Sequence, residues 1–211
     1  IKNEPKRNYL YGSTGAQVIG CTDIDNRGLT GIEYSLDSVL KGKKGYIIRQ
    51  KDAKGNISPA SDLPIIPAQN GQSVKLTIDI DFQRIVEYEL QQGVKNSGSE
   101  SGTVIAMDIS SGEILAMASY PTYDPNIMDD RDEHSMRNRA ITDVYEPGST
   151  FKLITAAAAL EQKIISPENY VDGYKGLFQY KDIKIVDEHP LGRVQFKEAV
   201  VYSSNIVFSN L

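Results

Sequence analysis

The chain has 211 residues, and 40% of them are hydrophobic, which is enough apolar content for one large or two modest folded domains. The net charge of -5 argues against nucleic acid as a partner. Apolar stretches such as residues 153–160 are far shorter than the roughly 20 residues that cross a bilayer, and no signal-peptide pattern is present.

Residues 1–72 are rich in Gly, Asn, Lys and Ser, and they predict a small β-rich domain. Short β-prone pieces lie at residues 16–19 and 45–49, and prolines at positions 59, 64 and 67 mark an irregular connector. Cys21 is the single cysteine, so an internal disulfide is excluded, and we expect it to be a small core residue. The segment also contains Ser38-Val-Leu-Lys41, a match to the Ser-x-x-Lys pattern of serine acyltransferases, but a charged, glycine-rich turn follows it and argues against a site.

From Ser73 onward the pattern alternates between strand and helix, and we expect a second, α+β domain over residues 73–211. Residues 74–78 predict a strand, and Asp79 or Asp81 can cap the helix that follows. Two apolar strands are predicted at residues 102–108 and 113–119, and the Ser-Ser-Gly turn between them indicates a hairpin.

The segment from residue 120 to residue 139 predicts a polar loop. Its acidic residues Asp129, Asp130 and Asp132 are typical of a solvated face, and their spacing does not fit a calcium loop. His134 and His189 are the two histidines, and no helix-spaced ligand pair or Cys-x-x-Cys is present. We therefore expect no metal site.

The stretch from Pro147 to Lys152 predicts a serine nucleophile at the start of a buried helix. Residues three apart share a helix face, so the amine of Lys152 is expected beside the hydroxyl of Ser149. A serine needs a neighbouring base, and burial in the apolar helix would lower the pKa of Lys152 far enough for it to serve as that base. The alternative is that Ser149 only caps the helix and that Lys152 lies on a solvated face.

Downstream, Ser203-Ser204-Asn205 is the single Ser-x-Asn of the chain. On its own this triplet would indicate a helix or turn cap. One family of serine hydrolases and transferases, however, combines Ser-x-x-Lys with an element of the Ser-x-Asn type, so the two motifs together favour catalysis.

At this point the chain resembles the transpeptidase domain of class B penicillin-binding proteins. Residues 137–152 are similar to the nucleophile block of that family, above all to its division and sporulation branch. Residues 76–79, 112–117 and 123–126 are similar to further family signatures in the expected order, and residues 28–33 resemble the pedestal region. The resemblance implies an α+β, penicillin-binding-protein/serine β-lactamase-like transpeptidase domain, incomplete here, preceded by a β-rich pedestal or dimerisation domain.

The resemblance also implies a function, that of a peptidoglycan D,D-transpeptidase. Ser149 would attack the bond between the two terminal D-alanines of a stem peptide, and Lys152 would take its proton. Ser203 would relay a proton to the departing D-alanine, and Asn205 would hydrogen-bond the substrate amide and help fix Lys152. Ser204 would contribute backbone and packing only, and no cofactor would be needed. Expected partners are stem peptides, β-lactams and division or sporulation proteins, with the protein anchored at the extracytoplasmic face of the bacterial membrane by a segment outside these residues.

One feature of the family pattern is missing, because no Lys-Thr-Gly or Lys-Ser-Gly occurs in the chain. In relatives this element follows Ser-x-Asn on a sheet strand, so we expect that these 211 residues are truncated before it. In the family, a backbone N–H near this strand completes the oxyanion hole. Because losing one oxyanion donor costs a factor of roughly 100 to 1,000 in rate, we expect little or no acyl transfer from these residues alone. We also expect an open sheet edge and reduced stability.

Two other functions remain as alternatives. A serine β-lactamase or β-lactam sensor would use the same nucleophile, and a non-catalytic scaffold for division or sporulation would depend mainly on residues 1–72. A Ser-His-Asp arrangement using His134 or His189 is a further mechanistic alternative, although Lys152 makes it unnecessary.

Overall fold

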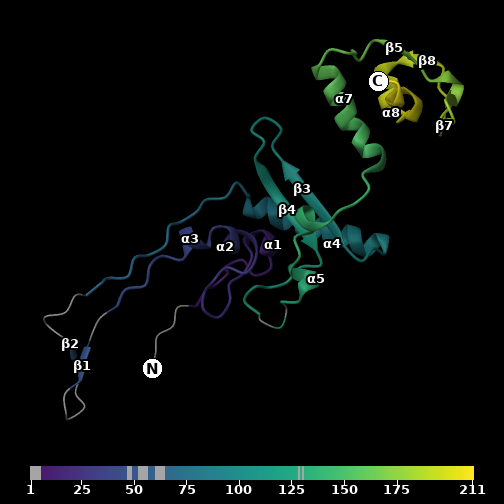
Figure 1. Ribbon diagram of the computed structural model, residues 1–211. Helices are drawn as coiled ribbons and strands as arrows, with labels where there is room; N and C mark the ends of the chain where they lie inside the picture. Colours follow the sequence, from purple (N-terminus) through teal and green to yellow (C-terminus); the bar gives the residue numbers. More distant parts are fainter. Residues whose placement is uncertain (1–5, 47–48, 52–56, 60–64, 128, 130) are drawn as a thin grey trace. The chain divides into compact units, whose positions relative to one another are not determined.

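The computed structural model describes residues 6–46, 49–51, 57–59, 65–127, 129 and 131–211. The chain divides into two compact units, Ile1–Asp143 and Val144–Leu211, which are considered separately below (Figure 1). This division groups residues 73–143 with the N-terminal part, so the expected domain boundary after residue 72 stays a prediction. Within the described ranges, no helix is both long and apolar enough to cross a membrane.

The N-terminal part of the first unit begins with three short helices, α1 (Ala16–Ile19), α2 (Gly31–Ser35) and α3 (Asp37–Leu40). The prediction of a β-prone piece at residues 16–19 is therefore wrong, because these residues form α1. Its four residues stand between Gly15 and Gly20, which both adopt positive φ (68° and 81°) and bend the chain at each end. Gly31 is held against α1 so closely that a Cβ would lie 2.5 Å from Val18 O.

Two short strands, β1 (Arg49–Lys51) and β2 (Ile57–Pro59), pair antiparallel farther along, with Gln50 opposite Ser58. Of the β-prone piece at residues 45–49, positions 47 and 48 lie outside the described residues, as does Pro64. Tyr46 forms an isolated antiparallel bridge to Ile66, which connects the two chain segments that lead to and from the hairpin.

The long helix α4 (Ile80–Ser97) begins at Asp79, whose side chain accepts a hydrogen bond from Phe82 N. This confirms Asp79 as the cap. The strand expected at residues 74–78 is wrong, because that segment is irregular. Thr77 of this segment and Asp79 directly after it bond β4, from Thr77 Oγ1 to Ile114 O (2.7 Å) and from Asp79 N to Leu115 O (2.9 Å), but these two hydrogen bonds do not extend into a ladder.

The predicted hairpin is confirmed as β3 (Gly102–Met107) and β4 (Ile114–Tyr120), which pair antiparallel with Thr103 opposite Ser119. Asp108 organises the turn, since its Oδ1 accepts from the backbone and side chain of both Ser110 and Ser111. These hydrogen bonds, led by the Ser110 hydroxyl, lower the pKa of Asp108 to about 2. Helix α4 packs on the hairpin, mainly along β4 (Figure 1).

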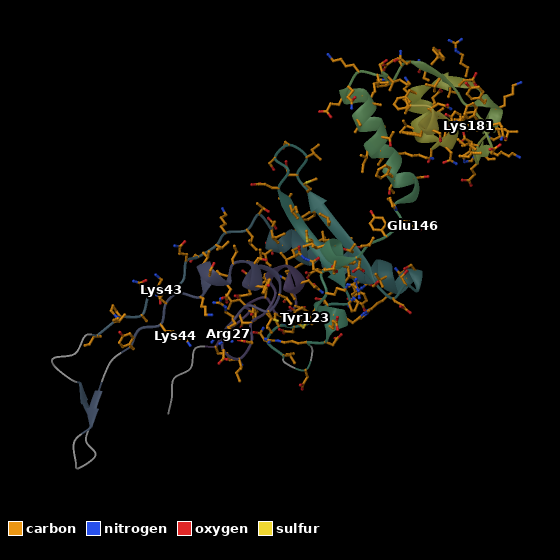
Figure 2. All side chains as sticks on the ribbon, in the orientation of Figure 1. Arg27, Lys43, Lys44, Tyr123, Glu146 and Lys181 are labelled. Atoms are coloured by element: carbon orange, nitrogen blue, oxygen red, sulfur yellow. The ribbon has the colours of Figure 1, made fainter. Side chains whose placement is uncertain are left out.

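Polar side chains join both α4 and the N-terminal segment to β4 and the loop after it. Gln83 is fully buried and exchanges hydrogen bonds with both backbone groups of Met117, at 2.8 Å each. Gln17 donates to Ser119 O, Pro121 O and Ser135 O. Tyr123, labelled in Figure 2, is buried and donates to Ala16 O. Cys21 is buried in the same cluster, which confirms it as a core residue.

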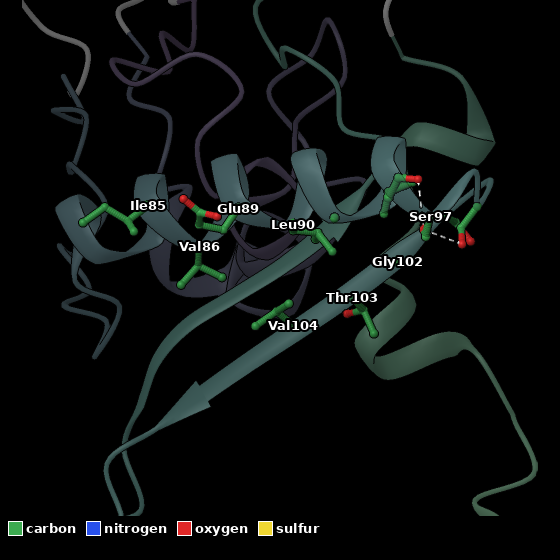
Figure 3. A pocket seen from close by; sticks show the side chains of 12 residues that line it. Ile85, Val86, Glu89, Leu90, Ser97, Gly102, Thr103 and Val104 are labelled. Carbon is green, nitrogen blue, oxygen red and sulfur yellow. Dashed lines mark hydrogen bonds between the residues drawn. The ribbon is translucent and has the colours of Figure 1, made fainter.

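An apolar groove of about 470 Å³ runs between α4 and β3, lined by side chains that include Val86, Leu90, Val94 and Val104 (Figure 3). Every predicted catalytic residue belongs to the second unit, so this groove is not the predicted site.

The unit closes with α5 (Glu133–Met136) and α6 (Arg139–Thr142). Asp132 from the acidic loop caps α5 by accepting from His134 N and Ser135 N, and hydrogen bonds, first from the Ser135 side chain, lower its pKa. Asp132 is thus a structural residue. Asp130 of the same cluster lies outside the described residues.

The second unit begins with a 3₁₀ turn, η2 (Gly148–Thr150), and helix α7 (Phe151–Glu161). Two small antiparallel sheets follow. Strand β5 (Tyr170–Asp172) pairs with β8 (Arg193–Gln195), and β6 (Leu177–Tyr180) pairs with β7 (Ile183–Val186), with η3 (Tyr174–Gly176) between β5 and β6. Helices α8 (Phe196–Val201) and α9 (Asn205–Ser209) end the chain.

The core of this unit is small and lies on one side of α7. Ala156 packs with Phe196, Ala199 and Val207 from the two final helices. The expectation that α7 is buried all round is wrong for the chain as described, because Phe151, Leu153 and Ile154 are 54%, 63% and 61% exposed. The two final helices contact only the alanine-bearing side of α7, so its larger apolar side chains remain uncovered.

Candidate active site

The predicted nucleophile lies on the turn that leads into α7. Pro147 has a helical φ of -67°, and Gly148 adopts a positive φ of 53°, which lets the chain turn sharply before the helix. Ser149 therefore lies on the 3₁₀ turn, two residues before α7 begins, and it is exposed. The regular helix begins two residues later than the sequence suggested, but Ser149 still precedes Lys152 by one turn of continuous helical backbone.

Lys152 uses its amine to contact the Ser-x-Asn element, 51 to 53 positions away. Its Nζ donates to Ser203 O (2.5 Å), Ser203 Oγ (3.0 Å) and Asn205 Oδ1 (2.6 Å). The ammonium also lies 5.8 Å from the centre of the Phe208 ring. Three of the four predicted residues are thus joined by direct hydrogen bonds.

The local environment lowers the pKa of Lys152 below its ordinary value. Partial burial is the main cause because it disfavours the charged ammonium, whereas the negative charge of Asp187 acts in the opposite direction. A lysine shifted in this direction is nearer to the neutral state that a general base requires.

The hydrogen bonds around Nζ also indicate how a neutral Lys152 would be oriented. Ser203 O and Asn205 Oδ1 can only accept, whereas a serine hydroxyl can donate as well. When Lys152 loses its proton, its two remaining N–H groups can stay on the two acceptors, and its lone pair then faces Ser203 Oγ. This contact is therefore a path along which a proton can move between Lys152 and Ser203.

Ser203 reaches Lys152 because its backbone is left-handed, with φ of 52°. The residue follows α8, where Ser203 N donates to Val200 O, and the positive φ turns both its carbonyl and its hydroxyl toward Nζ. Such a conformation costs a non-glycine residue roughly 1–2 kcal/mol. A backbone outlier at this position is what a functional constraint would produce.

Asn205 is held from both ends of its amide group. Oδ1 accepts from Lys152, and Nδ2 donates to Val186 O at 2.9 Å, the last residue of β7. Each end of the amide faces a group of the matching type, so the orientation of the side chain is fixed.

The structure corrects the expectation for Ser204, the middle residue, which was expected to contribute only backbone and packing. Ser204 is 1% exposed, and its hydroxyl donates to Asp187 Oδ2 (2.5 Å) and accepts from Val207 N (3.1 Å), capping α9. A short polar residue is needed here because the site is buried and both partners are polar.

Sequence reasoning missed Asp187. It is 6% exposed, and it accepts from Ser204 Oγ and from Ile206 N (3.1 Å). The one sequence signal for Asp187 was its place directly after the strand-like run Ile183–Val186. Acidic residues are common at such positions, and the position does not indicate which residues the carboxylate bonds. Only the tertiary fold brings it to the Ser-x-Asn turn.

The structure gives the two histidines contacts with residues other than Ser149. The ring of His189 contacts Tyr202, with centroids 5.8 Å apart, and His134 contacts Arg139 in the first unit. Where side chains are described, no group of three His, Cys, Asp or Glu residues gathers in a way that could hold a metal ion.

Comparison with known families gives two matches that together cover most of the chain. Residues 102–211 match the penicillin-binding protein transpeptidase domain, and residues 1–76 match the penicillin-binding protein dimerisation domain. Both had been expected from the sequence, and the matches confirm the fold class.

Individual relatives agree with the family matches. The probable peptidoglycan D,D-transpeptidase PenA of Neisseria gonorrhoeae is 42% identical over 76% of this chain and 28% of its own length. FtsI of Escherichia coli K12, a peptidoglycan D,D-transpeptidase, is 33% identical over 100% of this chain and 35% of its own length. Stage V sporulation protein D of Bacillus subtilis is 40% identical over 79% of this chain and 26% of its own length. The chain thus spans about a third of the length of these curated relatives.

Solved structures show the same likeness. Penicillin-binding protein 3 of Mycobacterium tuberculosis, in its apo form, superposes with a TM-score of 0.78 at 30% identity, covering 96% of this chain and 42% of the other. Structures of that protein complexed with ampicillin and with aztreonam give the same TM-score of 0.78. The chain therefore belongs to the class B penicillin-binding proteins, with a dimerisation-domain region followed by a transpeptidase-domain region.

Proposed function

We propose that the protein is a peptidoglycan D,D-transpeptidase that works through an acyl-enzyme on Ser149. The observation that carries the proposal is the cluster in which Lys152 Nζ bonds both Ser203 and Asn205, one helical turn after an exposed serine. The names of the relatives support this function and do not favour a β-lactamase or a scaffold.

In the first half-reaction, neutral Lys152 takes the proton of Ser149 as Oγ attacks the carbonyl carbon of the penultimate D-alanine. The carbon–nitrogen bond to the terminal D-alanine then breaks. The departing amine receives a proton from Ser203, and Ser203 regains one from Lys152 along the 3.0 Å contact. The products are free D-alanine, neutral Lys152 and an ester on Ser149.

In the second half-reaction, an amine of a neighbouring stem peptide attacks the ester. A proton leaves the attacking amine through Ser203 and Lys152, and Ser149 Oγ regains a proton as the ester bond breaks. The result is a new peptide bond between two stems, which is a crosslink. Asn205 acts by binding the substrate amide and by keeping Lys152 in place. A β-lactam would enter the same path, its ring amide opening to leave an ester on Ser149.

The proposed setting follows from the substrate. Stem peptides with free D-Ala-D-Ala ends lie outside the cytoplasmic membrane, so we place the activity at its outer face. One relative is named for sporulation, and division or sporulation proteins are the proposed partners.

The test is labelling by a fluorescent penicillin, using the full-length protein. We expect the wild type to be labelled stoichiometrically and Ser149→Ala not to be labelled. Ser38→Ala is the matched control because Ser38 begins the other Ser-x-x-Lys of the chain. Labelling of Ser149→Ala at the wild-type rate, or loss of labelling in Ser38→Ala, would refute the assignment.

A further inference from the structure

We propose that Asp187 is a positioning residue for the acyl-transfer site, holding the Ser203-Ser204-Asn205 turn against Lys152 from behind and supplying the negative charge that acts on the lysine. The inference rests on the proposed function of Ser149 and Lys152, and it adds a residue that does not touch the substrate-facing hydroxyl or amine.

The geometry of the turn carries the first half of the proposal. Asp187 binds the two neighbours of Asn205, since Oδ2 accepts from Ser204 Oγ at 2.5 Å and Oδ1 accepts from Ile206 N at 3.1 Å. Asn205 itself donates to Val186 O, the residue before Asp187. Residues 204 to 206 are therefore tied to Val186, the last residue of β7, and to Asp187, which follows it.

Asp187 is itself anchored. Its backbone N donates to Gly176 O at 3.1 Å, which connects the end of β7 to the residue that precedes β6. Gly176 has a positive φ of 81°, and a Cβ there would lie 2.8 Å from Pro190 Cα, so the approach requires glycine. The backbone that carries the carboxylate is thus held in place by a hydrogen bond to Gly176.

A helix cap alone does not account for these contacts. Ser204 already caps α9 through Val207 N, which requires only its own hydroxyl oxygen. The additional hydrogen bonds to Asp187 orient the Ser204 hydroxyl and the Ile206 amide. They thereby fix the backbone on both sides of Ser204, from which the side chains of Ser203 and Asn205 project. Both of those residues bond Lys152.

Charge carries the second half. Asp187 is almost fully buried, and its charge raises the pKa of Lys152 against the lowering effect of burial. Other titratable side chains stand on the elements packed around this turn: Glu161 on α7, Lys184 on β7, Glu188 and His189 after it, and Lys197 and Glu198 on α8. Among the groups described, Asp187 is the one whose charge changes the pKa of Lys152.

The sign of the effect is definite. Lys152 works as a base when it is neutral, so acylation rises with pH through the pKa of Lys152. Replacing Asp187 by Asn keeps the volume but removes the negative charge. The pKa of Lys152 then falls, and the acidic limb of the rate profile moves to lower pH.

The experiment measures the acylation rate constant of the full-length protein with a fluorescent penicillin from acidic to alkaline pH. For Asp187→Asn we expect acylation at least about tenfold slower on the plateau, because the turn is loosened, together with an acidic limb at lower pH. Ser204→Ala removes the hydrogen bond to Asp187 and the cap of α9 but keeps the charge of Asp187, so we expect slower acylation with the acidic limb unmoved. Asp182→Asn, an exposed aspartate in the β6–β7 turn, is the matched control and should behave as the wild type.

An Asp187→Asn protein with the wild-type plateau, or with a lower plateau and an unmoved acidic limb, would overturn the proposal. If Asp187→Asn does not fold, as judged by circular dichroism, Ser204→Ala decides, and a wild-type rate in that variant overturns the positioning role. None of these results affects the proposed function, which fails separately if Ser149→Ala is labelled.

Discussion

Asn205 holds Lys152 at the start of α7 although 53 positions separate the two residues, with Oδ1 accepting from Nζ at 2.6 Å. The other end of the same amide donates to Val186 O at 2.9 Å. The amide therefore links the lysine to strand β7, and the predicted chemistry depends on both ends of it.

Replacing Asn205 by Asp tests this link. The new oxygen would face Val186 O without a proton to share, and the new negative charge would raise the pKa of Lys152. Because Lys152 must be neutral to act, the acidic limb of the acylation profile should move to higher pH, opposite to the direction expected for Asp187→Asn. A pH series of penicillin acylation checks this, and a limb that stays in place would contradict it.

Lys152→Arg tests the identity of the base. Arginine keeps the positive charge but remains protonated at every working pH, so it cannot accept the proton of Ser149. We expect acylation to fall by about 100-fold or more. Lys41→Arg, in the second Ser-x-x-Lys, is the control and should leave the acylation rate unchanged. Retention of activity in Lys152→Arg would remove lysine from the mechanism.

The left-handed backbone of Ser203 allows a separation of function from stability. Ser203→Ala loses the hydroxyl and keeps the strain, whereas Ser203→Gly loses the hydroxyl and relieves it. Both variants should lose acylation. Thermal melts should show Ser203→Gly as the more stable of the two, by roughly 1 kcal/mol. Equal stability would mean that the positive φ stores no strain.

Gln83 is expected to be a major source of stability in the first unit. It is fully buried and bonds both backbone groups of the half-buried Met117, so Gln83→Leu removes both of these hydrogen bonds. We expect the free energy of unfolding to fall by about 3 kcal/mol. Gln91→Leu, at a half-buried position of the same helix, should change it by less than about 1 kcal/mol. Denaturant titration of both variants distinguishes the two effects.

Glu87 gives a prediction for pH. Burial raises its pKa, although Gln83 Nε2 and Gly15 N donate to it. A carboxyl whose pKa is raised on folding binds its proton more readily in the folded state, so its ionisation costs stability as the pH rises through that pKa. Glu87→Gln should remove this contribution and flatten the pH dependence of unfolding between the two pKa values. An unchanged pH dependence would contradict this prediction and would mean that the hydrogen bonds from Gln83 and Gly15 offset the effect of burial on the pKa of Glu87.

Much of the site could be predicted from the sequence because its residues occur in two short motifs, Ser-x-x-Lys and Ser-x-Asn. Ser149, Lys152, Ser203 and Asn205 were all expected, and the structure joins the last three by hydrogen bonds. Their catalytic roles stay predictions. Asp187 could not be found because its partners are 17 and 19 positions away and no local pattern marks it.

The fold was predicted best where a local signal is strong. The Asp79 cap and the hairpin around Ser110-Ser111 follow directly from turn and cap chemistry. The strands predicted at residues 16–19 and 74–78 were wrong because a mainly apolar segment of only four or five residues fits a strand, a helical turn or an extended segment equally well, and tertiary contacts decide. The domain boundary after residue 72 and the inactivity of these 211 residues alone stay predictions.

The most direct measurement is to locate the ester. The full-length protein would be incubated with a stem-peptide analogue ending in D-Ala-D-Ala or with a penicillin, digested, and analysed by mass spectrometry. We predict that the acyl group is on Ser149, in the peptide that also contains Lys152, and that it is absent from Ser149→Ala. An acyl group on Ser203, on Ser38 or on no residue would contradict the proposed mechanism.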